Sequence, residues 1–298
     1  MSKFLIKLFL LFLVFSFSGT LKSEPKHIIL TSSKGAGSFI FAKELVRLLF
    51  SSDKNRKSKF IISKEDSSEN RLLQLASKRV SLAIIDAKTA HDKLKKYSSL
   101  RVLSVLWRNW LHILGTTPGK FLSLESTKTL LVHENSIHFA KVWKNLSPKT
   151  EISWFNSRII PDFKDGFSQE VLAVTGPFPI VQINNWLEQF PGIRLLVIED
   201  KLIQSLKSNN HWLREEILPA HSFSYQAEEI KSLTWRPVLV TNIDFPEELG
   251  LLILKTIFSQ RKKLNPHLLF KKLQIEDNTY FKKIYSYHSS TKKLLDKK

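Results

Sequence analysis

The fold of this chain is decided by residues 27–38, which read His-Ile-Ile-Leu-Thr-Ser-Ser-Lys-Gly-Ala-Gly-Ser. The apolar start of this stretch predicts a short strand, and the glycines predict a loop. After the loop, apolar residues recur with helical spacing at Phe39, Ala42, Leu45, Leu48 and Leu49. The order of strand, glycine loop and helix indicates an α/β fold.

The same order continues along the chain. Strands are predicted at 60–62 and 82–85, and a helix with Ser67 as its N-cap follows the first of them. A helix over 89–97 leads to two further strands, at 102–106 and 111–114. Because strands alternate with helices, we expect a mainly parallel sheet.

A second series of strands and helices begins after the turn at 116–119. Its strands are predicted at 130–132, 152–155, 171–174 and 195–198, and its helices at 137–143 and 181–190. A strand at 238–241 and a helix at 246–259 would then return to the first lobe. We therefore expect two lobes with a cleft between them: residues 24–112, residues 113–236, and a return segment 237–298. Its lysine-rich end from 282 is expected to be a partly ordered helix with fraying lysines.

The first 23 residues have the outline of a secretory signal peptide. Lys3 and Lys7 precede an apolar run over residues 8–15, and small and polar residues follow it. The run is shorter than the roughly 20 residues that span a bilayer. We expect cleavage after Thr20 or Ser23 and export to the periplasm, with an uncleaved membrane anchor as the alternative.

The composition limits the chemistry of the chain. It contains no cysteine, which excludes disulfides, thiolate metal sites and a lipid-anchoring cysteine. The net charge is +19, and removal of residues 1–23 with their three lysines would leave +16. Such a charge favours small anions, anionic lipid or polyanions as partners. The lysines are spread along the whole chain, so a compositional habit of the organism explains the charge equally well.

Four junctions between a strand and a helix are candidate ligand sites, at 34–38, 67–70, 133–136 and 175–178. In open α/β sheets, ligands bind beyond the carboxyl ends of the strands, where helix N-termini attract anions. The residues expected to donate hydrogen bonds, supply charge or form an apolar wall are Lys34, Ser38, Ser68, Asn70, Asp86, Arg108, Ser136 and Phe178. Each junction taken singly is also consistent with an ordinary capped turn.

Recognisable catalytic and metal motifs are absent from the sequence. Gly35 and Gly37 are followed by Ile40 where a dinucleotide fingerprint has a third glycine, and there is no Walker loop or G-x-S-x-G elbow. His133 and His138 are five residues apart, which places them on different faces of a helix. The tryptophans are not interleaved with basic residues, as nucleic-acid binding requires. We expect no enzyme activity, cofactor, metal or nucleic acid; an exported hydrolase with a triad assembled in space is the minor alternative.

Several short motifs resemble, in order, those of the TAXI-type solute receptors of TRAP (tripartite ATP-independent periplasmic) transporters. They are the glycine loop at 34–39, S-E-N-R-L at 68–72, L-A-I-I-D at 82–86, G-P-F-P at 176–179, G-I-R-L-L at 192–196, Pro219-Ala220 with Tyr225, and L-V-T at 239–241 with P-E-E at 246–248. The resemblance implies a two-lobed periplasmic-binding-protein fold of type II with mixed, mainly parallel sheets. It also implies a monomeric receptor that captures a small organic anion, such as an acidic amino acid, and delivers it to membrane permease subunits.

The chain departs from this family at three places. Where the family usually has G-x-x-G-S-G-T, residues 133–138 keep only Ser136. Asp86 stands in place of a usual glutamine and would repel an anion unless Lys88 or Arg108 offsets its charge. His221 replaces a usual glycine. The alternative hypothesis is therefore a diverged envelope protein that does not transport and binds polyanions, anionic lipid or a protein through its basic surface.

Overall fold

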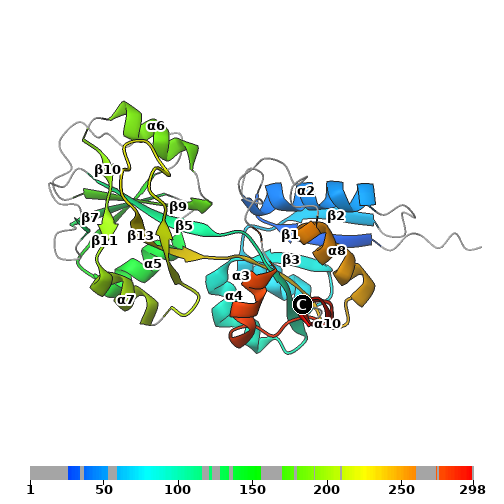
Figure 1. Ribbon diagram of the computed structural model, residues 1–298. Helices are drawn as coiled ribbons and strands as arrows, with labels where there is room; N and C mark the ends of the chain where they lie inside the picture. Colours follow the sequence, from blue (N-terminus) through cyan, green and yellow to red (C-terminus); the bar gives the residue numbers. More distant parts are fainter. Residues whose placement is uncertain are drawn as a thin grey trace, which may run out of the picture.

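The chain forms two lobes joined by two crossing segments, as the computed structural model shows (Figure 1). It describes residues 26–33, 37–52, 59–115, 121–122, 128–133, 137–155, 170–177, 180–190, 192–208, 210–259, 273 and 275–296. The predicted signal peptide, residues 1–23, lies outside these ranges. Each lobe has a mixed β-sheet with helices on both faces, so the predicted two-lobed α/β fold is confirmed.

The sheet of the first lobe has the strand order β2-β1-β3-β14-β4. Its strands are β1 (Lys26–Thr31), β2 (Lys59–Lys64), β3 (Leu82–Ile85), β14 (Val238–Asn242) and β4 (Leu100–Val105). β1 is parallel to β2 and β3, because helices make the connections that parallel pairing requires. β14 enters directly from the second lobe and is antiparallel to both of its neighbours, β3 and β4.

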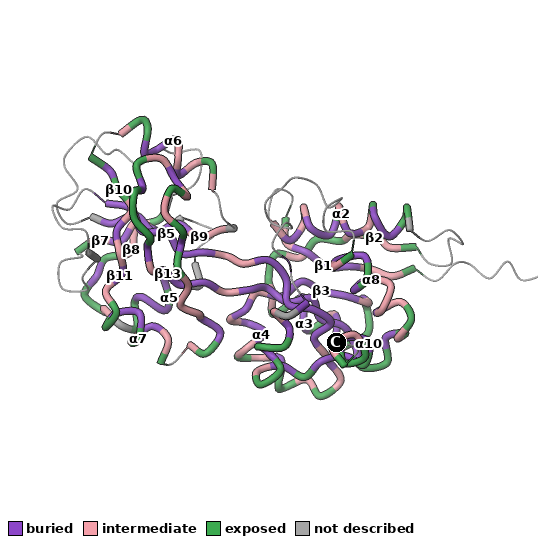
Figure 2. Tube along the Cα trace, viewed as in Figure 1, coloured by how far each residue is buried: buried purple, intermediate pink, exposed green. Residues whose placement is uncertain are grey.

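Alternating residues of these strands support a core on each face of the sheet. Ile29 and Ile84 pack with α2 (Gly37–Ser52) and α8 (Glu247–Ser259). Leu30 follows Ile29 on β1, and Ala83 precedes Ile84 on β3. Both therefore point to the opposite face, where they pack with α3 (Ser68–Ala76), α4 (Ala87–Lys93) and the C-terminal segment. Figure 2 shows these buried strands between the more exposed helices.

The sheet of the second lobe has the order β12-β13-β5-β9-β7-β8, with β10 also paired to β5. Its strands are β5 (Asn109–Gly115), β7 (Thr129–His133), β8 (Glu151–Phe155), β9 (Glu170–Pro177), β10 (Arg194–Leu195), β12 (Arg214–Leu218) and β13 (Ile230–Trp235). α5 (Ile137–Leu146) and α7 (Asp200–Ser208) cover one face, and α6 (Val181–Gln189) covers the other. β6 (Phe121–Leu122) and β11 (Val197–Ile198) form a separate two-stranded sheet.

The sheets are mixed, as predicted, but parallel pairing is not dominant. Among the described strands it occurs only within β1–β2–β3, within β7–β8–β9 and between β6 and β11. The strands next to the crossing segments pair antiparallel, because the chain passes straight between the lobes there without a helical crossover. Residue 112, the predicted end of the first lobe, lies within β5 of the second sheet.

The lysine-rich C-terminal segment is part of the core of the first lobe. It contains α9 (Glu276–Tyr280), a short 3-10 helix over Phe281–Lys283 and α10 (Ser289–Leu295). Phe281, Tyr285 and Tyr287 are buried, and Tyr287 forms a bridge with Val102 of β4. The expectation for this end was a partly ordered helix, and the structure has α10 there, with Lys292 and Lys293 exposed. The buried aromatic rings fill the sheet face opposite α2.

Candidate functional site

The carboxyl edge of the first sheet faces the second lobe. β1, β2 and β3 are parallel, so their carboxyl ends lie at one edge. β4 runs in the same direction, since β3 and β4 are both antiparallel to β14. Because β4 leads directly into β5 of the second lobe, this shared edge is the one that faces that lobe (Figure 1).

The carboxyl ends of three strands in the second lobe point back toward the first. β5 begins at the junction with Asn109, which pairs with Pro177 at the end of the antiparallel strand β9. β7 is parallel to β9, and β8 is parallel to β7. The loops that follow Thr31, Lys64 and Ile85 in one lobe and His133 and Pro177 in the other therefore start at edges that face each other.

The first junction of the first lobe is held by serine side chains. Ser38 is buried in the first turn of α2, and its Oγ accepts from the backbone N–H of Ser32 (3.2 Å) and also bonds Ser32 Oγ. Ser33 donates its backbone N–H (2.7 Å) and its hydroxyl to Oδ1 of Asp66. These hydrogen bonds hold the pKa of Asp66 below its ordinary value, so the exposed Asp66 carboxylate is ionised at this edge.

The second and third junctions are tied together through Ser68 and Arg71. Ser67 is the N-cap of α3 and accepts from the backbone N–H of Asn70 (3.2 Å), as predicted. Ser68 Oγ accepts from Arg71 Nη2 (2.5 Å) and from the backbone N–H of Asp86 (3.3 Å). Asp86 caps α4 through the N–H of Thr89 (2.9 Å). Ser68 and Asp86 therefore position each other across two loops.

Arg71 supplies the positive charge beside Asp86. Its side chain is buried, and its Nη1 donates to the backbone oxygen of Asp66 (3.1 Å) and to that of Glu65. Burial lowers the pKa of Arg71, and the carboxylates of Asp86, Asp66 and Glu65 act in the opposite direction. Lys88 instead pairs with Asp92 on α4. Arg71 was missed as a functional candidate, although it stands within the S-E-N-R-L motif.

Arg108 lies in the first crossing segment and has an acidic partner of its own. Its Nη1 is 2.5 Å from Oε2 of Glu216 on β12, and its guanidinium lies over the ring of Trp110 at 5.8 Å. Its buried Nε has no hydrogen-bond partner among the described residues. The guanidinium predicted to balance a bound carboxylate is thus already paired within the second lobe.

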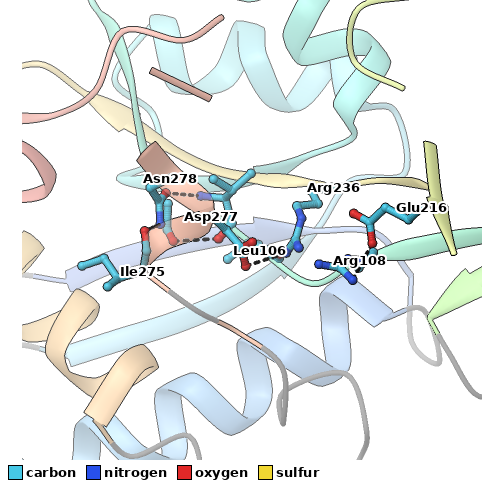
Figure 3. Close-up of polar contacts among 9 residues, drawn as sticks. Leu106, Arg108, Glu216, Arg236, Ile275, Asp277 and Asn278 are labelled. Carbon is cyan, nitrogen blue, oxygen red and sulfur yellow. Dashed lines mark hydrogen bonds and ion pairs between the residues drawn. The ribbon is translucent and has the colours of Figure 1, made fainter. Parts of the chain in front are cut away.

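Arg236 lies in the second crossing segment and was not predicted. Its side chain is 2 % exposed, lies 2.9 Å from Oδ2 of Asp277 and donates to the carbonyl of Leu106 in the other crossing segment (3.2 Å) (Figure 3). Burial lowers its pKa to about 10. Asn278, next to Asp277, accepts from the backbone N–H of Val105 (2.8 Å). The C-terminal segment therefore braces both crossings; the signal in the sequence is an Arg-Pro pair at the predicted lobe boundary.

The predicted site residues are distributed as follows. Ser38, Ser68, Asn70 and Asp86 lie at the carboxyl edge of the first sheet, with Asn70 exposed and Ser38 buried. Arg108 lies in the crossing segment. Lys34, Ser136 and Phe178 lie outside the described residues.

No catalytic constellation occurs at the described part of these edges. His288 Nδ1 and Ser290 Oγ are 2.9 Å apart, but both side chains are buried in the first lobe, where His288 caps α10 and Ser290 donates to the carbonyl of Glu247. The described residues contain no group of three or more side chains placed to hold a metal ion. None of the described helices combines the length and the apolar character that crossing a bilayer requires.

The sequence of this chain is similar to one protein family, and its fold is similar to those of solved transport receptors. No curated protein matches the sequence significantly. Solved structures similar to the chain include an ABC-type phosphate transport receptor from Vibrio cholerae (13 % identity over 81 % of this chain and 98 % of that one, TM-score 0.47). PstS from Borrelia burgdorferi is also similar (12 % identity over 82 % of this chain and 97 % of that one, TM-score 0.47). Another is the amino acid ABC transporter substrate-binding protein AbpA from Streptococcus pneumoniae bound to L-arginine (15 % identity over 84 % of this chain and 94 % of that one, TM-score 0.44). The model of the NMT1-like family matches residues 150–296, slightly less than half of the chain, so over this part the protein is similar to that family.

Proposed function

We propose that this chain is an exported solute-binding receptor that closes its two lobes on a small organic anion and carries it to a membrane permease. The observation that carries the proposal is the facing of the two carboxyl edges, described above. Loops at such edges bring backbone N–H groups and hydroxyls to one place, which is how open α/β sheets bind ligands. The bound solute is not altered chemically, so the protein acts by binding and release.

The crossing segments are suited to act as the hinge of this closure. A hinge consists of a few residues at the ends of elements that absorb the change in backbone angles. Here residues 106–108 and 236–237 are short connections between long strands. Arg236 and Asp277 anchor one crossing to the first lobe, and Arg108 and Glu216 anchor the other to the second. Each lobe can then move as a unit while the two ion pairs stay intact.

The proposal is tested by isothermal titration calorimetry of the purified chain with dicarboxylates and acidic amino acids. At least one of them should bind saturably with a Kd on the order of micromolar. Asn70→Asp adds a negative charge at the carboxyl edge and should weaken binding of that anion about tenfold or more. Asn145→Asp makes the same change near the distal end of α5, at an exposed residue, and should leave the Kd within about twofold. Absence of saturable heat with every compound would contradict the proposal, as would equal effects of the two variants.

The type of permease rests on the ordered motifs that resemble TAXI receptors. We propose a TRAP-type permease on that basis, and a monomeric, periplasmic receptor. Deletion of the TRAP permease genes of the producing cells should abolish uptake of the solute that binds in calorimetry. Uptake that persists in this strain, and stops on deletion of an ABC permease instead, would overturn this assignment and leave the receptor function intact.

A second candidate function is a non-transporting envelope protein that binds polyanions. It is favoured by the net charge of +19 and by the loss of the usual glycines at residues 133–138. Binding of this kind falls steeply with salt, because it depends on the release of counterions. Strong, salt-sensitive binding of a sulfated polysaccharide by a chain that gives no heat with small anions would favour it over the receptor.

A further inference from the structure

The loop that joins β12 to β13, residues 219–229, lies at the end of the second lobe that is far from the hinge. Trp235 at the end of β13 pairs with Asn109 at the hinge, whereas Leu218 and Ile230 pair at the opposite end of the β12–β13 hairpin. Figure 1 shows this loop in yellow beside α6. We call it the Tyr225 loop. Because it is remote from the facing edges, it does not belong to the proposed solute site.

Gln226 holds the Tyr225 loop in one shape. Its buried side chain donates from Nε2 to the carbonyls of Pro219 and Glu228, both at 2.9 Å, and its Oε1 accepts from the N–H of Phe223 (3.2 Å). Its backbone carbonyl accepts from the N–H of His221 (2.9 Å). The loop is therefore closed on itself by one glutamine.

Two further contacts attach the loop to the second lobe. The backbone N–H of Ser224 donates to Asn184 Oδ1 and its hydroxyl donates to Glu188 Oε1, both on α6 and both at 2.9 Å. Phe223 is buried in the core below, edge-on to His112 with ring centroids 5.1 Å apart. Ser224 thus attaches the loop to α6 and Phe223 attaches it to the core, so the loop forms a platform fixed on the second lobe.

Tyr225 is presented at the tip of this platform at a cost to folding. Its φ is +61°, in the left-handed region that disfavours side chains with a Cβ, and His221 in the same loop has φ +59°. The side chain of Tyr225 is 84 % exposed, so its ring contributes little to the core. Strained backbone that is held by its surroundings is concentrated at functional sites. Folding alone favours glycine or asparagine at this position.

The Tyr225 loop and α6 are acidic in a chain that is strongly basic. No lysine or arginine occurs between Arg214 and Lys231, or within α6, although the net charge is +19. Glu228 and Glu229 are exposed on the loop, and Glu188 is exposed on α6 beneath it. An exposed ring on a loop and a helix that carry carboxylates and no lysine or arginine is complementary to a basic surface with a recess for an aromatic side chain.

We propose that the Tyr225 loop docks onto another protein that offers a basic surface with a recess for the tyrosine ring. Anionic lipid and nucleic acid carry the same sign of charge as the three glutamates, which would repel them. A second copy of this chain would have to place its basic surface against the acidic loop. Such a contact joins two different patches and would assemble copies into a ring or an open chain, whereas we propose a monomer. A different protein is therefore the occupant that the charges fit.

The partner can be captured with the full chain in the cells that produce it. A photoreactive benzoylphenylalanine at position 225 should crosslink to one protein with a basic surface. The same residue at position 50, where Phe50 is 67 % exposed on α2, should not capture it. Equal capture from both positions would overturn the proposal, and so would crosslinking only to a second copy of the chain.

Purified components then separate docking from folding. Tyr225→Gly removes the ring and relieves the left-handed backbone, so the melting temperature should not fall. Its Kd for the captured partner should rise at least tenfold, as is usual for an aromatic anchor. Glu229→Lys should weaken the complex and reduce its dependence on salt. Phe50→Ala should change neither the affinity nor its dependence on salt.

Unchanged affinity of Tyr225→Gly would overturn the proposal. So would a fall in the melting temperature of Tyr225→Gly large enough to account for its loss of binding. Solute titration of Tyr225→Gly should match the original chain, which keeps this test independent of the proposed receptor function.

Discussion

At the scale of single residues, His112 is an ionisable group placed where charge is costly. It lies on β5, 2 % exposed, beside a small cavity lined by apolar side chains and Ser232. Neither ring nitrogen has a hydrogen-bond partner among the described residues. Burial lowers its pKa from 6.5 to about 3. The folded protein therefore keeps His112 neutral over a pH range in which the unfolded chain protonates it.

This difference predicts a pH dependence of stability. The unfolded state binds the extra proton between about pH 6.5 and pH 3, so the contribution of His112 to stability is full above this window and is lost as the pH falls through it. At pH 5 the loss is about 2 kcal/mol relative to pH 7.5. His112→Leu removes the titrating group at similar volume and should narrow the difference in unfolding free energy between the two pH values by this amount. Urea unfolding of both proteins at pH 5 and 7.5 measures it, and identical pH profiles would refute the account.

Arg236 and Asp277 make a second prediction at this scale. Asp277→Asn leaves a buried guanidinium without its ionic partner and should cost about 3 kcal/mol of unfolding free energy. Replacing both residues, as Arg236→Met with Asp277→Asn, should recover much of the loss, because no buried charge is then left unpaired. Urea unfolding of the three proteins checks this. The exposed pair Lys231–Asp200 is the control, and Asp200→Asn should cost no more than about 1 kcal/mol.

At the scale of elements, the close packing of α8 on α10 depends on a glycine. A Cβ added at Gly250 would lie 2.3 Å from Ser290 Oγ and 3.0 Å from Ser290 Cβ. Gly250→Ala should therefore destabilise the protein by about 1–3 kcal/mol through overpacking, although alanine favours an isolated helix by about 1 kcal/mol. Ser290→Gly in the same chain should restore part of the stability. Thermal unfolding tests this, and a stabilising Gly250→Ala would show that α10 does not pack on α8 as described.

The predictions of elements succeeded where the local pattern and the burial agree. β3 has the predicted bounds, because its four residues are all buried and leave an uninterrupted apolar run. β12 was missed, since Arg214, Glu215 and Glu216 make an edge strand look like a charged turn. The strand predicted at 195–198 is divided between β10 and β11, which belong to different sheets. Local periodicity detects burial, and it does not identify the sheet to which a strand belongs.

At the scale of the whole molecule, closure of the lobes predicts a coupling between solute and stability. A solute that touches both lobes binds only the folded chain, and at a concentration one hundred times its Kd it should add about 2.7 kcal/mol to the unfolding free energy. The melting temperature should rise accordingly, and the radius of gyration from small-angle X-ray scattering should fall as the lobes approach. Binding without any change in the radius of gyration would contradict closure.

The α/β class, the two series of strands and helices, and the junctions where Ser68, Asn70 and Asp86 lie could be predicted from the amino-acid sequence, because they follow from periodicity and helix capping within short stretches. The partners of the charged residues depend on the folded arrangement. Arg108 meets Glu216 and Arg236 meets Asp277 across long separations in the chain. The packing of Phe281, Tyr285 and Tyr287, from the lysine-rich C-terminal segment, in the core of the first lobe also depends on the folded arrangement. The physical reason is that a local pattern reports whether a side chain is buried, whereas the pairing of charges depends on which distant elements the fold brings together.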